Sequence, residues 1–393
     1  MSFLATLCLF GILYAYFGYF FILLVLYNLK INKFKSDEKQ VPEVNVITII
    51  VTVRNEMTVI LEKIQSTLAL RYKDKSVETW LKQGASSPVQ LIVASDCSDD
   101  DTDPVVKRFA KLGVELVSLP ERKGKEVAQK AAIAKARGDI ILFTDAKIVL
   151  ESKILDNVAQ HFTDPTVGIV SSVDQVLGGA TGGSGEGMYV KYEMMLRKLE
   201  SSFYSLIGVS GSCFAARKVV AEKIVADIPS DFCLLLEAVK QGFRGVHAED
   251  VIASYKAVKS EKEEFDIKVR TVLRGMSAFF ARTEFLDFSH YGFFSWMLAS
   301  HKLARWLVPV WALILSILLF PLAFHGDLWS MLLIFEILFF ILAYKAWKDP
   351  EMASYLVFKV PLFLVVTNAG ILMAWIKYVT GQRAATWDPS NKG

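Results

Sequence analysis

The stretch VNVITIIVTV, residues 44–53, decides the fold of the polar part of this chain. Its nearly unbroken apolar and β-branched character is typical of a parallel strand that is buried on both faces. Further strands are expected at residues 89–94, 114–118 and 139–144, with helix-forming stretches between them, notably 123–137. Strands that alternate with helices predict a parallel sheet in an α/β fold. Because ligands of such sheets bind beyond the carboxyl ends of the strands, we look there for a functional site.

The polar block is flanked by apolar segments. Residues 1–29 contain no Asp, Glu, Lys or Arg, and further low-charge runs lie within residues 307–378. Each run approaches or exceeds the roughly 17–25 residues that cross a bilayer core. With 53% hydrophobic side chains over 393 residues, and a mean hydropathy of +0.37, the chain is too apolar for an ordinary soluble protein. Its 22% of charged residues is too many for an all-membrane bundle. A secreted enzyme, a soluble cytoplasmic enzyme and a many-helix transporter are therefore disfavoured.

The predicted organisation has five parts. An N-terminal transmembrane anchor (1–29) precedes an α/β domain (30–290), and an interfacial helix (291–306) then leads into about three transmembrane helices (307–378) and a tail (379–393). The glycine-rich stretch 178–187 is expected to be a flexible loop.

The side of the membrane follows from local charge. Lysines 30, 33, 35 and 39 come directly after the first apolar run, which places the domain in the cytoplasm and the N-terminus outside. A signal peptide is the rival interpretation, but it would have a basic start and a shorter apolar core. Four crossings would put the C-terminus outside, whereas Lys377 and Arg383 favour the inside, so one segment could be re-entrant or interfacial. The net charge of +3 does not suggest a nucleic-acid partner.

Polar and acidic side chains follow three of the predicted strands. Arg54 and Glu56 come after the first strand, residues 95–102 (SDCSDDDT) after the second, and Asp145 after the fourth. Taken alone, each group could be a solvated loop or a helix cap. Their joint placement at one edge of the sheet indicates a site.

These groups, with others further along the chain, resemble the motifs of the membrane-bound family-2 glycosyltransferases. That family includes the cellulose, chitin and hyaluronan synthases and smaller bacterial exopolysaccharide or lipid glycosyltransferases. The resemblance runs from about residue 44 to residue 306. On the donor side, residues 95–102 are similar to the family's S-D-x-S-x-D-x-T segment, residues 122–125 to its R-x-G-K turn and residues 144–146 to the start of its D-x-D motif. On the acceptor side, residues 192–200 are similar to the helix before the acceptor site, residues 211–217 to the acceptor loop and residues 230–231 to the acidic pair. Residues 301–306 are similar to the Q-x-x-R-W signature, with His in place of Gln.

The resemblance implies a GT-A type domain with a Rossmann-like mixed sheet that binds a nucleotide sugar, expected to be UDP-linked. It implies Asp231 as the general base of an inverting displacement and Asp145 as the ligand of Mg²⁺ or Mn²⁺. The other implied positions fall into two sets: Arg54, Glu56, Asp96, Lys125 and Arg305 for the nucleotide, and Gly211, Ser212, Cys213, His301 and Trp306 for the acceptor.

Each of these roles has a structural alternative. Asp96 could be a turn residue, Lys125 a solvated helix-end lysine and Asp231 an N-cap. Arg305 could be a snorkelling arginine and Trp306 an interfacial tryptophan at a membrane boundary.

The chain departs from the family pattern at Lys147, which stands where D-x-D has its second acid. Three interpretations remain open. Asp145 holds the metal with phosphate and water ligands, Lys147 replaces part of the metal's charge, or catalysis has been lost.

The function expected from the sequence is transfer of a sugar to a membrane-associated glycan or lipid acceptor, in polysaccharide or glycolipid synthesis. The protein is expected to be integral to a bacterial inner membrane. It could form a homo-oligomer or bind an export partner. The alternative is a catalytically impaired membrane scaffold or nucleotide-sugar sensor.

Overall fold

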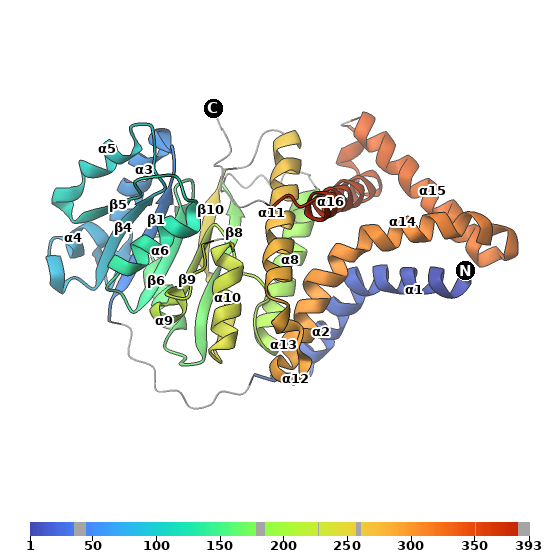
Figure 1. Cartoon of the computed structure of the whole chain (residues 1–393), viewed down its shortest axis with the longest axis horizontal. Coiled ribbons are helices and arrows are strands. Elements are labelled where there is room, and N and C mark those ends of the chain that lie inside the picture. Colours follow the sequence, from blue (N-terminus) through green and yellow to red (C-terminus); the bar gives the residue numbers. More distant parts are fainter. Residues whose placement is uncertain (35–44, 178–184, 227, 257–260, 350, 384–393) are drawn as a thin grey trace. The chain divides into compact units, whose positions relative to one another are not determined.

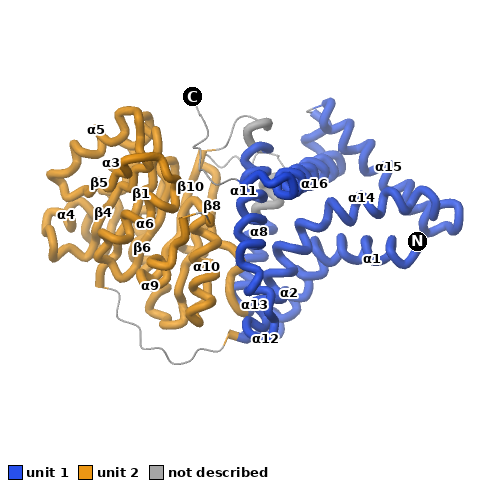
Figure 2. Tube along the Cα trace, viewed as in Figure 1, with its two compact units in different colours: residues 1–33, 179–203, 258–383 blue, residues 34–178, 204–257, 384–393 orange. Residues whose placement is uncertain are grey.

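The computed structural model describes residues 1–34, 45–177, 185–226, 228–256, 261–349 and 351–383. Two compact units are built from interleaved parts of the chain (Figure 2). Unit 1 comprises residues 1–33, 179–203 and 258–383, and unit 2 comprises residues 34–178, 204–257 and 384–393. The single domain expected over 30–290 is therefore divided, because the helix at 185–203 and the helix at 261–281 belong to unit 1.

Unit 2 is built on a mixed sheet of eight strands among the described residues (Figure 1). The spatial order is β5-β4-β1-β6-β9-β8-β10-β7. β9 runs antiparallel between β6 and β8, and β7 runs antiparallel beside β10, while the other neighbours are parallel. The strands are β1 (Ile47–Val53), β4 (Val89–Ser95), β5 (Val114–Ser118), β6 (Ile140–Asp145), β7 (Val149–Leu150), β8 (Val167–Val176), β9 (Cys213–Arg217) and β10 (Arg244–Tyr255), with a separate hairpin of β2 (Arg71–Tyr72) and β3 (Lys75–Ser76).

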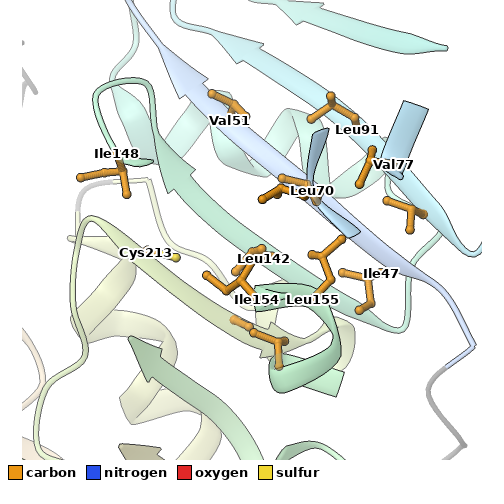
Figure 3. Close-up of a cluster of buried hydrophobic side chains, with 14 of the residues drawn as sticks. Ile47, Val51, Leu70, Val77, Leu91, Leu142, Ile148, Ile154, Leu155 and Cys213 are labelled. Carbon is orange, nitrogen blue, oxygen red and sulfur yellow. The ribbon is translucent and has the colours of Figure 1, made fainter. Parts of the chain in front are cut away.

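Helices cover both faces of this sheet, which is why β1 is apolar on both sides. One core contains Ile49 and Val51 of β1 with Ile60 and Ile64 of α3, and the opposite core contains Ile50 with residues of α6, α9 and α10. Figure 3 shows part of the first core. The helices of unit 2 are α3 (Met57–Ala69), α4 (Val77–Leu81), α5 (Thr102–Lys107), α6 (Lys125–Lys135), α7 (Ile154–His161), α9 (Lys218–Ala221) and α10 (Ser230–Lys240).

Unit 1 is helical. Its elements are α1 (Ser2–Leu13), a π-helical turn (Tyr14–Gly18), α2 (Tyr19–Asn28), α8 (Gly185–Phe203), α11 (Glu261–Ala281), α12 (Phe288–Tyr291), α13 (Phe293–Leu298), a second π-helical turn (Ala299–Ala304), α14 (Arg305–Leu322), α15 (Asp327–Lys348) and α16 (Leu356–Val379). Four helical segments of the described chain are long and apolar enough to cross a membrane: Ser2–Asn28, Phe293–His325, Asp327–Lys348 and Leu356–Val379. This agrees with one N-terminal and three C-terminal candidate spans.

The expected interfacial helix over 291–306 continues into the following span without a break. Residues from Phe293 to His325 form one helical run, in which the H-x-x-R-W residues occupy the π-helical turn and the start of α14. A π-helical turn inserts an extra residue into the helix and is frequent at functional sites. Lys35 and Lys39, most of the glycine-rich stretch (178–184) and residues 384–393 of the tail lie outside the described residues.

Candidate active site

Asp96, at the end of β4, holds the turn that precedes α6. Its carboxylate is completely buried and accepts hydrogen bonds from the backbone N–H groups of Lys123 and Gly124, at 2.8–3.0 Å. Gly124 has φ +97°, a conformation that favours glycine, and α6 begins at the next residue. Both carboxylate oxygens accept backbone hydrogen bonds, so Asp96 positions the turn, and its contact with the nucleotide stays a prediction.

Lys125, the first residue of α6, contacts both the end of β6 and the Gly211 loop. Its ammonium lies 2.6 Å from Asp145 Oδ1 at the end of β6 and donates to the carbonyl of Gly211 at 3.1 Å. The Lys125 side chain is buried and that of Asp145 half-buried, so the pair is poorly screened by solvent. A helix N-terminus with a lysine is suited to binding an anion such as phosphate.

Glu56 and Lys147 form a second ion pair. Lys147 Nζ lies 3.4 Å from Glu56 Oε2, and the Glu56 side chain is 7% exposed whereas that of Lys147 is 35% exposed. Burial raises the pKa of Glu56 above its ordinary value, although the Lys147 charge opposes this.

Arg54 donates to the backbone carbonyls of Asp96 and Cys97, so its guanidinium stabilises the turn after β4.

Asp231 lies in the first turn of α10, after Pro229. A side chain added at Gly211 would place its Cβ 2.9 Å from Asp231 Oδ2, so the carboxylate lies close to the backbone of the Gly211 loop. The same Gly211 accepts the hydrogen bond from Lys125. The predicted base and the predicted phosphate-binding lysine therefore both lie close to Gly211.

The loop around Gly211 is tied to an acid that sequence reasoning missed. Asp174 Oδ1, on β8, accepts hydrogen bonds from the hydroxyls of Ser210 and Ser212, at 2.7 and 2.9 Å. The carbonyl of Ser212 in turn accepts the backbone N–H of Asp145 at 3.1 Å. Asp174 lies between Val173 and Gln175 near the end of β8, and its local sequence gives no sign of its contacts with the loop.

Cys213 follows this loop but does not present its side chain to it. It begins β9, is completely buried and packs in the core shown in Figure 3. Burial raises the pKa of its thiol to about 12, so the sulfur is a neutral core group. Of the three residues expected to bind the acceptor here, Gly211 is exposed and Ser212 is half-buried.

Lys63 of α3 is a second group that sequence reasoning missed. Its ammonium is buried beneath the end of β6 and donates to Thr144 Oγ1 at 3.0 Å and to the Ile148 carbonyl at 2.6 Å. Burial lowers its pKa to about 8. The carboxylate of Asp145 therefore has cationic groups beside it and below it.

Of the predicted residues, His301, Arg305 and Trp306 belong to unit 1 and form their own network there. His301 Nδ1 lies 2.6 Å from Glu200 Oε1 and its Nε2 lies 3.1 Å from Glu193 Oε1, while Arg305 donates to Glu193 Oε2 at 2.8 Å. Tyr19 donates to Glu200 as well. Trp306 is buried and packs edge-on against Phe279. These side chains connect α2, α8 and α14 within the helical unit.

A divalent cation does not fit the groups at the end of β6. Asp145 Oδ1 accepts a hydrogen bond from the ammonium of Lys125. The carboxylate of Glu56 is paired with the ammonium of Lys147. Within the described residues, no cluster of three or more His, Cys, Asp or Glu side chains has a geometry suited to a metal ion. A dication would have to bind among ammonium groups of its own sign.

Comparison with known proteins gives a consistent picture. Residues 48–225 match the family model described as glycosyl transferase family 2. A curated N-acetylglucosaminyltransferase from Rhizobium leguminosarum bv. trifolii is 35% identical over 85 residues, which cover 21% of this chain and 47% of the relative. Another from Rhizobium meliloti (strain 1021) is 26% identical over 155 residues, or 35% of this chain and 36% of the relative. The chain thus spans less than half the length of either relative.

Among solved structures, the mannosyltransferase PcManGT from Pyrobaculum calidifontis, in complex with GDP-Man and Mn²⁺, is similar over 96% of this chain and 98% of its own. The TM-score is 0.69 and the sequence identity 20%, so the likeness shows a shared fold.

Proposed function

Residues 48–225 form a glycosyltransferase family 2 domain, and from this premise we propose that the chain is a membrane-embedded, inverting glycosyltransferase. The donor is a nucleoside diphosphate sugar, with UDP as the expected nucleotide. The acceptor is a glycan or lipid hydroxyl held at the membrane, and the four apolar helical segments support that location.

One observation carries the proposal: the carboxylate of Asp231 and the ammonium of Lys125 both lie close to Gly211. A base and a phosphate-binding cation close to one exposed backbone position are what a single displacement requires. The acceptor hydroxyl gives its proton to Asp231 while its oxygen attacks the anomeric carbon. The bond from that carbon to the diphosphate oxygen breaks, and the anomeric configuration inverts. Lys125 offers the departing diphosphate a charged hydrogen-bond donor.

The test is a donor screen with the full chain reconstituted in lipid. Radiolabelled UDP-sugars are followed into lipid extract and into polymer. We expect transfer from at least one donor, and we expect Asp231→Asn to reduce turnover by about 10²- to 10⁴-fold while leaving UDP binding unchanged, because only the proton acceptor is removed. Asp250→Asn, at an exposed aspartate that pairs with His161, is the matched control and should keep full turnover.

Other results would lead to different conclusions. Wild-type protein that binds UDP but transfers no sugar from any donor would favour a scaffold or nucleotide-sugar sensor. Long polymer made by the isolated chain would favour a processive synthase over addition to a lipid or single acceptor.

A further inference from the structure

Lysines of this chain form two ion pairs at the end of β6. Two carboxylates, Asp145 and Glu56, are each paired with an ammonium group, from Lys125 and Lys147 respectively. A third ammonium, that of Lys63, lies below the strand end and donates to the hydroxyl of the neighbouring Thr144. Asp145 and Glu56 are thus already neutralised by lysines of this chain.

Lys147 is placed and exposed as a ligand-binding group would be. It follows Asp145 by two residues, at the carboxyl end of β6, where substrates of α/β sheets bind. Its side chain is 35% exposed while that of its partner Glu56 is 7% exposed, so Lys147 is the more accessible member of the pair. A lysine side chain is a flexible chain of four methylene groups. Its ammonium has three N–H donors, which can form hydrogen bonds to a carboxylate and to a phosphate at the same time.

The same arrangement disfavours a divalent cation. To bind Asp145, a dication would have to displace an ammonium at 2.6 Å from the carboxylate and remain close to Lys147 and Lys63. Interactions between like charges are strong in such a half-buried site, because solvent screens them poorly. An incoming diphosphate has the opposite sign and is attracted by the same lysines.

We infer that Lys147, together with Lys125, neutralises the diphosphate of the sugar donor in place of a divalent metal, so that donor binding by this chain is independent of metal. This rests on the proposed function and specifies how the donor site works. As the bond between the anomeric carbon and the diphosphate oxygen breaks, the electron pair stays on that oxygen. The two ammonium groups stabilise the added negative charge through hydrogen bonds, and neither gives up a proton.

The test measures UDP binding by titration calorimetry, with the full chain in lipid nanodiscs, in excess EDTA and with added Mn²⁺. Wild-type protein is expected to bind UDP equally well in both conditions. Lys147→Met should weaken binding in EDTA by about 10- to 100-fold, the range expected for one charged hydrogen bond. Lys147→Asp should abolish binding in EDTA and recover it with Mn²⁺, because it supplies a second carboxylate next to Asp145. Lys130→Met, at an exposed lysine of α6, is the matched control and should bind as wild type.

The outcomes separate this inference from the proposed function. Wild-type binding that needs Mn²⁺, or Lys147→Met that binds UDP as well as wild type in EDTA, overturns the inference but leaves a glycosyltransferase donor site. A folded wild-type protein that binds neither UDP nor GDP in either condition overturns both. Because the Lys147 side chain is partly exposed, we expect its variants to fold, and a thermal unfolding scan of each variant verifies this.

Discussion

At the scale of single residues, Lys63 is the least expected group in the site. A lysine in the middle of α3 would ordinarily lie on the solvent face, yet this one is 3% exposed and makes two internal hydrogen bonds. Nothing in its local sequence distinguishes it from a surface lysine. Its position follows from the packing of α3 against the sheet, which brings it beneath Thr144.

The pH dependence of stability should reveal this buried amine. The pKa of Lys63 is about 8 in the folded protein and about 10.4 in an unfolded chain, so burial penalises the charged form. The penalty is fully present below pH 8 and disappears as pH rises toward 10.4, which makes this contribution to stability increase with pH by about 3 kcal/mol. We expect the stability difference between wild type and Lys63→Met to shift by an amount of this order between about pH 7 and pH 10.

Apparent melting temperatures of the two purified proteins, measured across that pH range, test the prediction. A difference that stays constant with pH would mean that the Lys63 amine titrates at its ordinary value. Lys130→Met is again the surface control and should show no such pH dependence.

At the scale of elements, the start of α6 depends on Asp96, because this carboxylate holds the two backbone N–H groups that precede Lys125. In Asp96→Asn, one oxygen becomes an NH₂ group that faces a backbone donor. A buried donor without an acceptor costs about 1–3 kcal/mol of stability. We therefore expect a lower melting temperature and weaker UDP binding, since Lys125 loses its fixed position.

Asp250→Asn is the matched control for this variant, because that side chain is 48% exposed and pairs with His161 outside the 95–102 segment. Melting temperature and UDP affinity of both variants give the comparison. If Asp96→Asn bound UDP as wild type does while melting earlier, the turn would serve stability alone.

The elements also show how far sequence reasoning reached. The strands β1, β4, β5 and β6 were predicted because helices cover both faces of the sheet and the strands are therefore apolar throughout. Strand β9 was missed: residues 211–217 were interpreted as an acceptor loop, yet Cys213–Arg217 pairs with both β6 and β8. The contacts of Asp174 and Lys63 depend on such pairing and packing between distant segments, which no local pattern reports.

At the scale of the whole molecule, α16 is apolar enough to cross a membrane but packs along a charged helix. Lys268 of α11 lies over the ring of Phe363, and Phe280 of α11 packs against Trp375 and Tyr378. Between these contacts α11 carries Arg270 and Arg274. Charged side chains are costly in a bilayer core, so the α11–α16 pair is better suited to the membrane surface.

We therefore expect three crossings, by the segments Ser2–Asn28, Phe293–His325 and Asp327–Lys348. The C-terminus would then lie on the same side as the α/β domain, which agrees with the lysines at the end of α15 and with Lys377. Three crossings would place Lys377 and Arg383 on the cytoplasmic side, as their positive charge favours, whereas four crossings would place them outside.

Reporter fusions in bacteria test this topology. A fluorescent protein fused after Gly393 should fluoresce, as it does only in the cytoplasm, and alkaline phosphatase at the same position should be inactive. Fusions after Gly326, between α14 and α15, should give the opposite pair of results. Phosphatase activity at Gly393 would instead establish a fourth crossing by α16.

The backbone hydrogen bond from Asp145 to Ser212 bears on how the donor and acceptor preferences of this protein can be altered. Because this bond continues the pairing of β6 with β9, it ties the loop proposed to face the acceptor to the end of β6. New donor or acceptor preferences would therefore arise by exchanging side chains on a fixed frame. Directed evolution should accordingly concentrate on the side chains around the loop and leave the length of the segment from Ser210 to Cys213 untouched.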